Sequence, residues 1–242
     1  MTGTIFKNYI RYLTKTTANT LTDADLLMLA GVEQAAIAES IASNVDEGYF
    51  LMEDVRNLEA GVRKYTYPQD LLKSLKYIAA KLDGIKWSYL REIDFGYIEG
   101  RNLPLMEETT IQNEFANKTA KFMFTGTEIM LLNGAAIPVV AGGLKIVAEV
   151  YPENLVAADL AGTSLLSVPS VSTAVRLPLA AYKPLAKMVS IAYKTSKDKP
   201  LPLTEDEKLL PVDLSNLYTK LRGRNAVRVI QGSVPYDDGQ NY

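Results

Sequence analysis

The sequence contains no cysteine and no histidine among its 242 residues. Without cysteine there is no disulfide, no thiolate nucleophile and no thiolate metal site. Without histidine the chain lacks the side chain that titrates nearest neutral pH, and with it the Ser–His and Cys–His nucleophile pairs. An enzyme made from this composition would have to use carboxylates, lysine, tyrosine or an oxygen-bound Mg²⁺. We therefore expect a protein that is not an enzyme, with no cofactor and no metal.

Net charge is also small. Lys and Arg number 26 and Asp and Glu number 28, a formal net charge of -2. This balance gives no reason to expect a whole-protein field that attracts nucleic acid. No apolar run approaches the roughly eighteen residues that a membrane span needs, and the N-terminus lacks the apolar core of a signal peptide. We expect a soluble protein made in the cytoplasm, without membrane contact.

The first strong structural signal is a helix near the N-terminus. Thr22 is suited to be its N-cap, with Asp25 at the capping-box position. Apolar residues then recur at helical spacing up to about Val45. Several alanines keep this helix thin, which favours close packing against another helix. The nineteen residues before it predict an arm or a short first helix.

Helical pattern returns in the last third of the chain. Residues 179–194 carry an apolar stripe at helical spacing. Thr204 is the expected N-cap of a shorter helix, with Glu207 at the capping-box position three residues later. Residues 214–221 predict the last helical turns, and Pro211 is expected to break this stretch into two pieces.

The middle of the chain, residues 62–155, shows mostly strand patterns. Asp83-Gly84 fits a two-residue type I′ turn between two strands. A second hairpin is predicted from residues 120–124 and 128–132, and residues 144–151 alternate as a further strand. These segments predict an antiparallel module of roughly five strands.

The resulting fold class is α+β. Each helical end has an apolar stripe and too little mass to stand alone, so the two ends are expected to pack into one helical bundle. The predicted parts are an N-terminal helical part (1–61), an antiparallel β module (62–155), a linker with C-terminal helices that pack on the N-terminal helix (156–222), and an extended C-terminal arm (223–242).

Paired acidic residues are the first candidates for chemistry. They can hold Mg²⁺ or act as acid and base, but most lie at predicted helix starts or ends, where acids simply complement the helix dipole. A carboxylate-based hydrolase remains an alternative, with Glu107, Glu108 or Glu114 as its acids. Gly142-Gly143 does not predict a phosphate loop, because a strand follows it. The pairs are Asp23/Asp25, Asp46/Glu47, Glu107/Glu108 and Glu205/Asp206/Glu207.

Aromatic residues gather in the β module. They can form a stacking platform for a ligand or serve as core and cross-strand packing. Packing is the preferred interpretation, because these residues are not interleaved in the sequence with a dense basic pattern. The set is Tyr65, Tyr67, Tyr77, Trp87, Tyr89, Phe95 and Tyr97.

The C-terminus combines basic and apolar residues. Lys220 and Arg222 suit a helix C-terminal end, where cations favour the dipole. The residues beyond are interpreted as an arm ordered on a neighbouring chain, since disorder alone would not favour its apolar and aromatic residues. The predicted partner-binding residues are Arg224, Arg228, Val229, Ile230, Pro235, Tyr236 and Tyr242.

Several of these segments together resemble the head–tail connector (adaptor, neck) proteins of tailed bacteriophages. The resemblance implies a structural virion protein that forms a dodecameric ring beneath the portal protein and offers a surface to the tail or next neck protein. It also implies location in the virion neck after assembly in the host cytoplasm, with genome DNA passing through the ring without specific binding. The segments are Thr20–Leu27, Ile37–Glu39, Tyr49-Phe50, Tyr67–Lys73, Lys81–Trp87, Ser167–Ser170 and Pro235–Gly239.

Three alternatives remain beside the adaptor. A tail-completion or terminator protein of the virion would show sixfold stoichiometry and contact with the tail tube. The hydrolase requires a pocket that holds two carboxylates with perturbed pKa values. A binding module that uses the aromatic residues of the β module requires Trp87 and its neighbours to be exposed.

Overall fold

The chain divides into two units. The computed structural model describes residues 1–45, 49–69, 71–93, 107–162, 166, 175–197 and 201–232, with residues 73, 74 and 223–232 described by their backbone alone. One unit combines Met1–Phe50 with Tyr151–Tyr242, and the other is Leu51–Val150. We call them the terminal unit and the inserted unit. The terminal unit is helical and the inserted unit is mostly strand, so the predicted mixed α+β class is confirmed.

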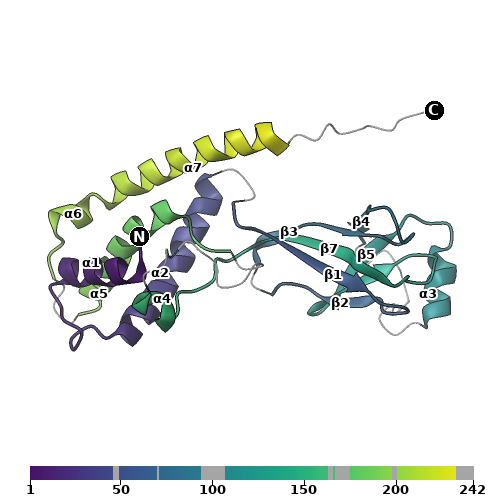
Figure 1. Cartoon of the computed structure of the whole chain (residues 1–242), viewed down its shortest axis with the longest axis horizontal. Helices are drawn as coiled ribbons and strands as arrows, with labels where there is room; N and C mark the ends of the chain where they lie inside the picture. Colours follow the sequence, from purple (N-terminus) through teal and green to yellow (C-terminus); the bar gives the residue numbers. More distant parts are fainter. Residues whose placement is uncertain are drawn as a thin grey trace. The chain divides into compact units, whose positions relative to one another are not determined.

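Helix α5 is the centre of the terminal unit. It packs against α1, α2 and α7. Helix α7, the longest element described, lies at the edge of the helices (Figure 1). Phe6 and Tyr182 meet edge to face in the buried core, with ring centroids 6.1 Å apart. The helices are α1 (Gly3–Thr14), α2 (Asp23–Asn44), α4 (Ala157–Ala161), the 3₁₀ turn η3 (Leu179–Ala181), α5 (Tyr182–Thr195), α6 (Glu205–Lys208) and α7 (Leu210–Gly232).

Both predicted capping boxes are present. Thr22 accepts a hydrogen bond from the N–H of Asp25, whose carboxylate accepts the N–H of Thr22 in return. Thr204 and Glu207 make the same reciprocal pair at the start of α6. These boxes satisfy backbone donors that an isolated helix start leaves free, which explains why both starts could be predicted from the sequence.

The strands of the inserted unit form one curled sheet. The strand order is β1-β7-β3-β4-β5-β6-β2, and every neighbouring pair is antiparallel except β4 and β5. The outermost strands β1 and β2 contribute Leu58 and Tyr65 to the same core, so the sheet closes around its apolar side chains. The strands are β1 (Leu51–Leu58), β2 (Lys64–Thr66), β3 (Leu71–Ala80), β4 (Ser88–Glu92), β5 (Lys121–Thr125), β6 (Glu128–Leu132) and β7 (Val140–Val150).

Helix α3 (Glu108–Phe115) covers a second apolar cluster of this unit. Phe115 from α3 packs with Met123 of β5 and Met130 of β6. The neighbouring side chains Phe122 and Ile129 belong to the main core instead. Because successive side chains of a strand point to opposite faces, the β5–β6 hairpin is buried on both sides.

The predicted hairpin of residues 120–132 is confirmed, whereas the predicted two-residue turn at Asp83-Gly84 is wrong. β5 and β6 pair as predicted, and Gly126 at their turn has a φ of +69°. The strands around Asp83-Gly84 pair as well, but their connection is longer than two residues because Ala80 pairs with Ser88. The Asp83 carboxylate accepts the N–H groups of Ile85 and Lys86. This side-chain hydrogen bonding stabilises a wider loop in place of the type I′ turn.

The predicted boundary of the β module is wrong at its start. Residues 51–58, which the sequence analysis assigned to the N-terminal helical part (1–61), form β1 at the edge of the sheet. Seven of its eight residues remain exposed or half-buried. An edge strand of this kind carries little apolar alternation, so the periodicity of the sequence did not reveal it.

The C-terminal segment also differs from its prediction. The backbone of α7 is helical as far as Gly232, so residues 223–232 continue a helix where an extended arm (223–242) was predicted. Extending an existing helix costs less free energy than starting a new one. This advantage outweighs the low helix propensity of Val227, Val229 and Ile230. Residues 233–242 of the predicted arm lie outside the described residues.

Candidate functional site

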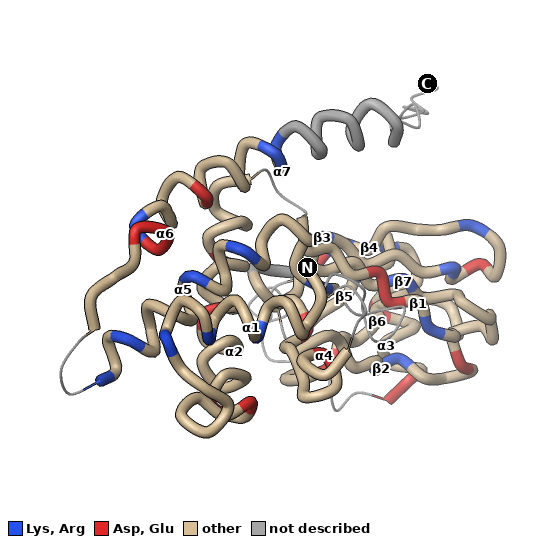
Figure 2. The backbone as a smooth tube through the Cα atoms, turned by 60° about the vertical axis from the view of Figure 1, so that its left-hand side comes forward, with Lys and Arg blue, Asp and Glu red and all other residues tan. Residues whose placement is uncertain are grey.

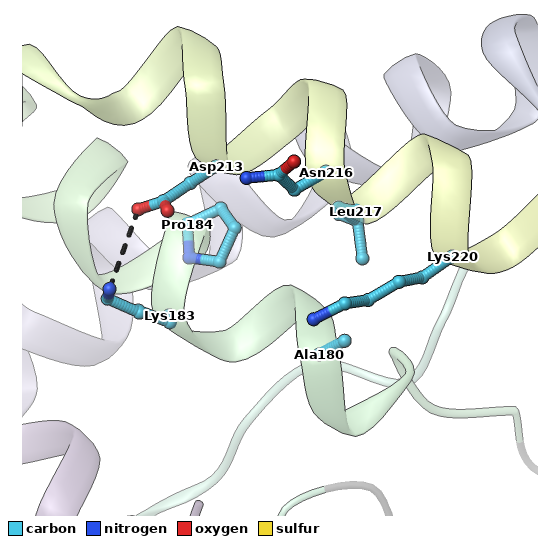
Figure 3. Close-up of a pocket in the computed structure, with 7 residues that line it drawn as sticks. All are labelled: Ala180, Lys183, Pro184, Asp213, Asn216, Leu217 and Lys220. Carbon is cyan, nitrogen blue, oxygen red and sulfur yellow. Dashed lines mark ion pairs between the residues drawn. The ribbon is translucent and has the colours of Figure 1, made fainter.

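A small pocket lies between α7 and the start of α5. It has a volume of about 190 Å³ and is lined by Lys183, Asp213, Lys220 and four other residues, whose side chains Figure 3 shows. Its single carboxylate is already engaged, because Asp213 accepts a hydrogen bond from Lys187 at 2.6 Å and lies 3.9 Å from Lys183. This pocket therefore lacks the two free carboxylates that acid–base hydrolysis requires.

The paired acids serve helix starts and ion pairs. Asp23 lies between Lys7 and Arg11, and hydrogen bonds from both hold the pKa of its carboxyl below its usual value. Asp206 and Glu207 bind lysines of α5. Asp46 and Glu47 lie outside the described residues. Within the described ranges, no group of three acidic side chains is close enough to hold a metal ion.

Two of the three acids of the hydrolase alternative are held in ion pairs. Glu108 receives hydrogen bonds from the guanidinium of Arg63, which holds the pKa of its carboxyl below the ordinary value. Glu114 pairs with Lys118 at 2.7 Å. A general acid needs a raised pKa, whereas that of Glu108 moves in the opposite direction.

The Arg63–Glu108 pair predicts a dependence of stability on pH. Because the folded-state pKa of Glu108 lies below the unfolded value, its contribution is present above that value and is lost as pH falls through the folded-state pKa. Glu108 is partly exposed, so we expect a loss of about 1 kcal/mol between pH 5 and pH 3. Thermal unfolding of wild type and Glu108→Gln over this range measures it. Parallel pH curves for the two proteins would contradict the prediction.

The contacts of the predicted C-terminal partner residues lie outside what the structure describes. Arg224, Arg228, Val229 and Ile230 lie on α7, where only the backbone is described, and Pro235, Tyr236 and Tyr242 lie outside the described residues. Of the neighbouring cations, Arg222 donates to the carbonyl of Asn44 at 2.7 Å, at the C-terminus of α2. Arg222 thus complements the dipole of a different helix from its own.

Helix α2 has an exposed apolar side. Met28 and Val32 are 66% and 67% exposed, and Ala36 is exposed one further turn along. These three residues, spaced four apart, form a continuous line on the helix surface, which we call the α2 stripe. The helix carries no Lys or Arg (Figure 2). Burial also raises the pKa of Glu33 beside the stripe.

The apolar character of α2 is high on both sides of the helix. Its opposite side is buried against α5 through residues that include Leu26 and Ile37. Among the described helices, α2 is the one with a length and composition sufficient to cross a membrane. Core helices of soluble proteins can be equally long and apolar. Of the most apolar 18-residue stretch of α2, 39% is buried in the terminal unit. On the other side of the helix, Met28 and Val32 of the α2 stripe stay exposed in the described chain.

A second exposed apolar patch surrounds the start of the C-terminal helices. Leu209, the C-cap residue of α6, is 52% exposed, and Val212 in the first turn of α7 is 54% exposed. Leu201 and Leu203, just before α6, are also exposed. We call these four residues the α6–α7 patch. The terminal unit thus presents two apolar surfaces on different elements.

The aromatic residues of the β module separate into two groups. Tyr65 is buried in the core and Tyr67 packs on Phe124 with ring centroids 5.2 Å apart, as the packing interpretation predicted. Tyr77, Trp87 and Tyr89 are exposed, Tyr89 by 69%, and do not belong to the core. Tyr77 and Tyr89 do pack on each other across β3 and β4, as the cross-strand part of this interpretation predicted. Phe95 and Tyr97 lie outside the described residues.

Sheet register explains why these three aromatics share a surface. Ala79 of β3 pairs with Tyr89 on one side and with Lys145 of β7 on the other. The rings of Tyr77 and Tyr89 meet at 5.3 Å. Lys81 and Lys145 place their ammonium groups 4.9 and 5.4 Å from the Trp87 ring centroid. We call Tyr77, Trp87, Tyr89, Lys81 and Lys145 the aromatic face.

One of the two lysines of the aromatic face is held by an ion pair. Lys145 binds Glu53 of β1 at 2.8 Å, and this hydrogen bond raises the pKa of its ammonium group. Lysines over an aromatic ring are favourable cation–π contacts. Sequence spacing did not reveal this mixture of rings and cations, because the residues come from three strands and a loop.

Comparison with protein-family models and with curated proteins identifies no relative. The sequence matches no protein-family model and no curated protein. Interpretation of function therefore rests on the surfaces described above and on the sequence resemblance.

Proposed function

We propose that this chain is a structural protein of a tailed-bacteriophage virion, a head-to-tail adaptor that joins the portal vertex to the tail or next neck protein. In this proposal the helices of the terminal unit form the bundle that is the body of a homo-oligomeric, dodecameric ring. The C-terminal segment, with Arg224 and Arg228, reaches the portal protein. Genome DNA passes through the ring without specific binding.

The observation that carries the proposal is the pair of apolar surfaces on the terminal unit. A closed ring needs two different surfaces on each copy, since neighbours meet head to tail. The α2 stripe and the α6–α7 patch supply two such surfaces on separate elements. Apolar side chains that stay exposed in one chain gain free energy when a neighbour removes them from water. We therefore assign a second copy of this chain as the partner of the α2 stripe.

Substitution of Val32 by glutamate tests this assignment. Glutamate has a better helix propensity than valine, so the fold should survive while a charge enters the apolar contact. We expect Val32→Glu to remove the ring that wild type forms when mixed with its portal protein, as measured by native mass spectrometry. Its unfolding temperature should stay within a few degrees of wild type.

Val139→Glu is the matched control. Val139 is 75% exposed and lies in the inserted unit, outside the α2 stripe and the α6–α7 patch. This variant should form the same ring as wild type. A wild-type chain that stays monomeric in the presence of the portal protein would refute the adaptor function, whereas sixfold complexes with tail-tube protein alone would favour the terminator alternative.

A further inference from the structure

We propose that the aromatic face of the inserted unit docks onto an acidic surface of another protein of the virion. This inference rests on the proposed function, and it names the chemistry of one partner. The ring contacts assigned above use the terminal unit alone. The aromatic face belongs to the other unit and is therefore available for a different partner.

The composition of the face matches that of a protein-binding surface. Tyrosine and tryptophan are enriched in the residues that dominate binding energy, where they fill the centre of an interface. Here Tyr77, Trp87 and Tyr89 form such a centre, and Lys81 and Lys145 stand beside it. Ile85, in the same loop as Trp87, is 78% exposed and adds an aliphatic contact.

The charges of the face select an acidic partner. Lys81 has no carboxylate partner among the described residues and contacts the Trp87 ring alone. Two carboxylates lie near the face, and both are engaged: Glu53 binds Lys145, and Asp83 accepts backbone N–H groups of its own loop. The Lys81 ammonium group therefore offers donors without a carboxylate acceptor, which carboxylates of a partner can satisfy.

Other ligand classes fit this chemistry less well. Neutral sugars need strong hydrogen-bond acceptors as well as donors beside the rings, and both carboxylates near this face are already engaged. Single-stranded nucleic acid is bound by many cations along a groove together with stacking rings. This chain has a formal net charge of -2, and the exposed Ile85 neither stacks nor pairs with bases.

Hydroxyl-radical footprinting and carbodiimide cross-linking of purified particles test the proposal. Radical modification of Trp87 and Tyr89 should be lower by about fivefold or more in particles than in the free chain, because central interface residues lose their water. Carbodiimide joins a lysine amine to a carboxylate with loss of water. It should therefore link Lys81 or Lys145 to Asp or Glu of a different virion protein.

Variants separate a docking role from a structural one. The double variant Trp87→Ala/Tyr89→Ala should enter particles at the wild-type copy number and lose the cross-link. Tyr12→Ala, which removes a tyrosine of 77% exposure from the terminal unit, should keep the cross-link. The free chain is also mixed with a thirty-nucleotide oligothymidylate and with dextran, a neutral polysaccharide, as probes.

Each outcome has a defined meaning. Equal modification of Trp87 and Tyr89 in the free chain and in particles would overturn the docking proposal, as would protection of the free chain by the oligonucleotide or the polysaccharide. Such results leave the adaptor function intact if the chain is present in particles. Particles that contain no copy of the chain would overturn both proposals.

Discussion

Lys194→Met is expected to destabilise the terminal unit by about 3–5 kcal/mol. Lys194 on α5 donates to the Glu207 carboxylate at 2.5 Å, and both side chains are almost completely buried. Burial alone would raise the pKa of Glu207, but hydrogen bonds from Lys194, Ser190 and Thr204 hold it below the ordinary value. Without Lys194 a buried carboxylate would lose its only countercharge among the described residues.

The double variant Lys194→Met/Glu207→Gln makes this prediction specific. Glutamine keeps the capping box with Thr204 and removes the negative charge, so the second substitution should recover much of the loss. Urea unfolding followed by far-ultraviolet circular dichroism gives the free energies of unfolding for a double-mutant cycle. Additive effects of the two substitutions would mean that the buried pair does not hold α6 to α5.

Gly3→Ala is expected to cost about 3 kcal/mol, for a different reason. A Cβ atom at Gly3 would lie 1.7 Å from the carbonyl oxygen of Asp159 and 2.9 Å from the Cα of Leu160. These are backbone atoms of α4, which cannot rotate away as a side chain can. The alanine therefore forces α1 and α4 apart, and packing of Phe6 in the core is lost with them.

Gly31→Ala is the matched control for the same change in a helix. A Cβ at Gly31 meets nothing within 4 Å, and alanine is favoured over glycine inside a helix by roughly 0.5–1 kcal/mol. We expect this variant to raise the free energy of unfolding in urea while Gly3→Ala lowers it. Changes of the same sign in the two variants would contradict the close approach of α1 and α4.

Prediction from the sequence succeeded where the determinants are local. The capping boxes at Thr22 and Thr204 use residues three positions apart, and the turn at Gly126 lies between two strands that pair with each other. Strand β1 was missed because its partner β7 lies some ninety residues further along the chain, as the Val55–Lys145 pair shows. The burial pattern of β1 depends on that pairing.

The α2 stripe and the aromatic face could not be predicted from the sequence in the same way. The α2 stripe was anticipated only as a thin helix suited to close packing, because periodicity does not say which side of an apolar helix a domain covers. The aromatic face depends on the register of the strands. Ala79 pairs with Tyr89 on one side and with Lys145 on the other, and only this pairing brings the two residues to the same part of the sheet. A shift of one residue would turn these side chains to the other face, so their exposure is a property of strand pairing.

The start of β1 and the end of β7 lie side by side in the sheet, which matters for how the chain can evolve. Leu51 and Glu149, at the entrance and exit of the inserted unit, face each other across the sheet, about 5 Å apart as neighbouring strands are. A gap of this width can be bridged by a very short peptide. The whole insert can therefore be gained, exchanged or deleted as a unit without displacing Phe50 and Tyr151, which lets one helical scaffold carry different inserts.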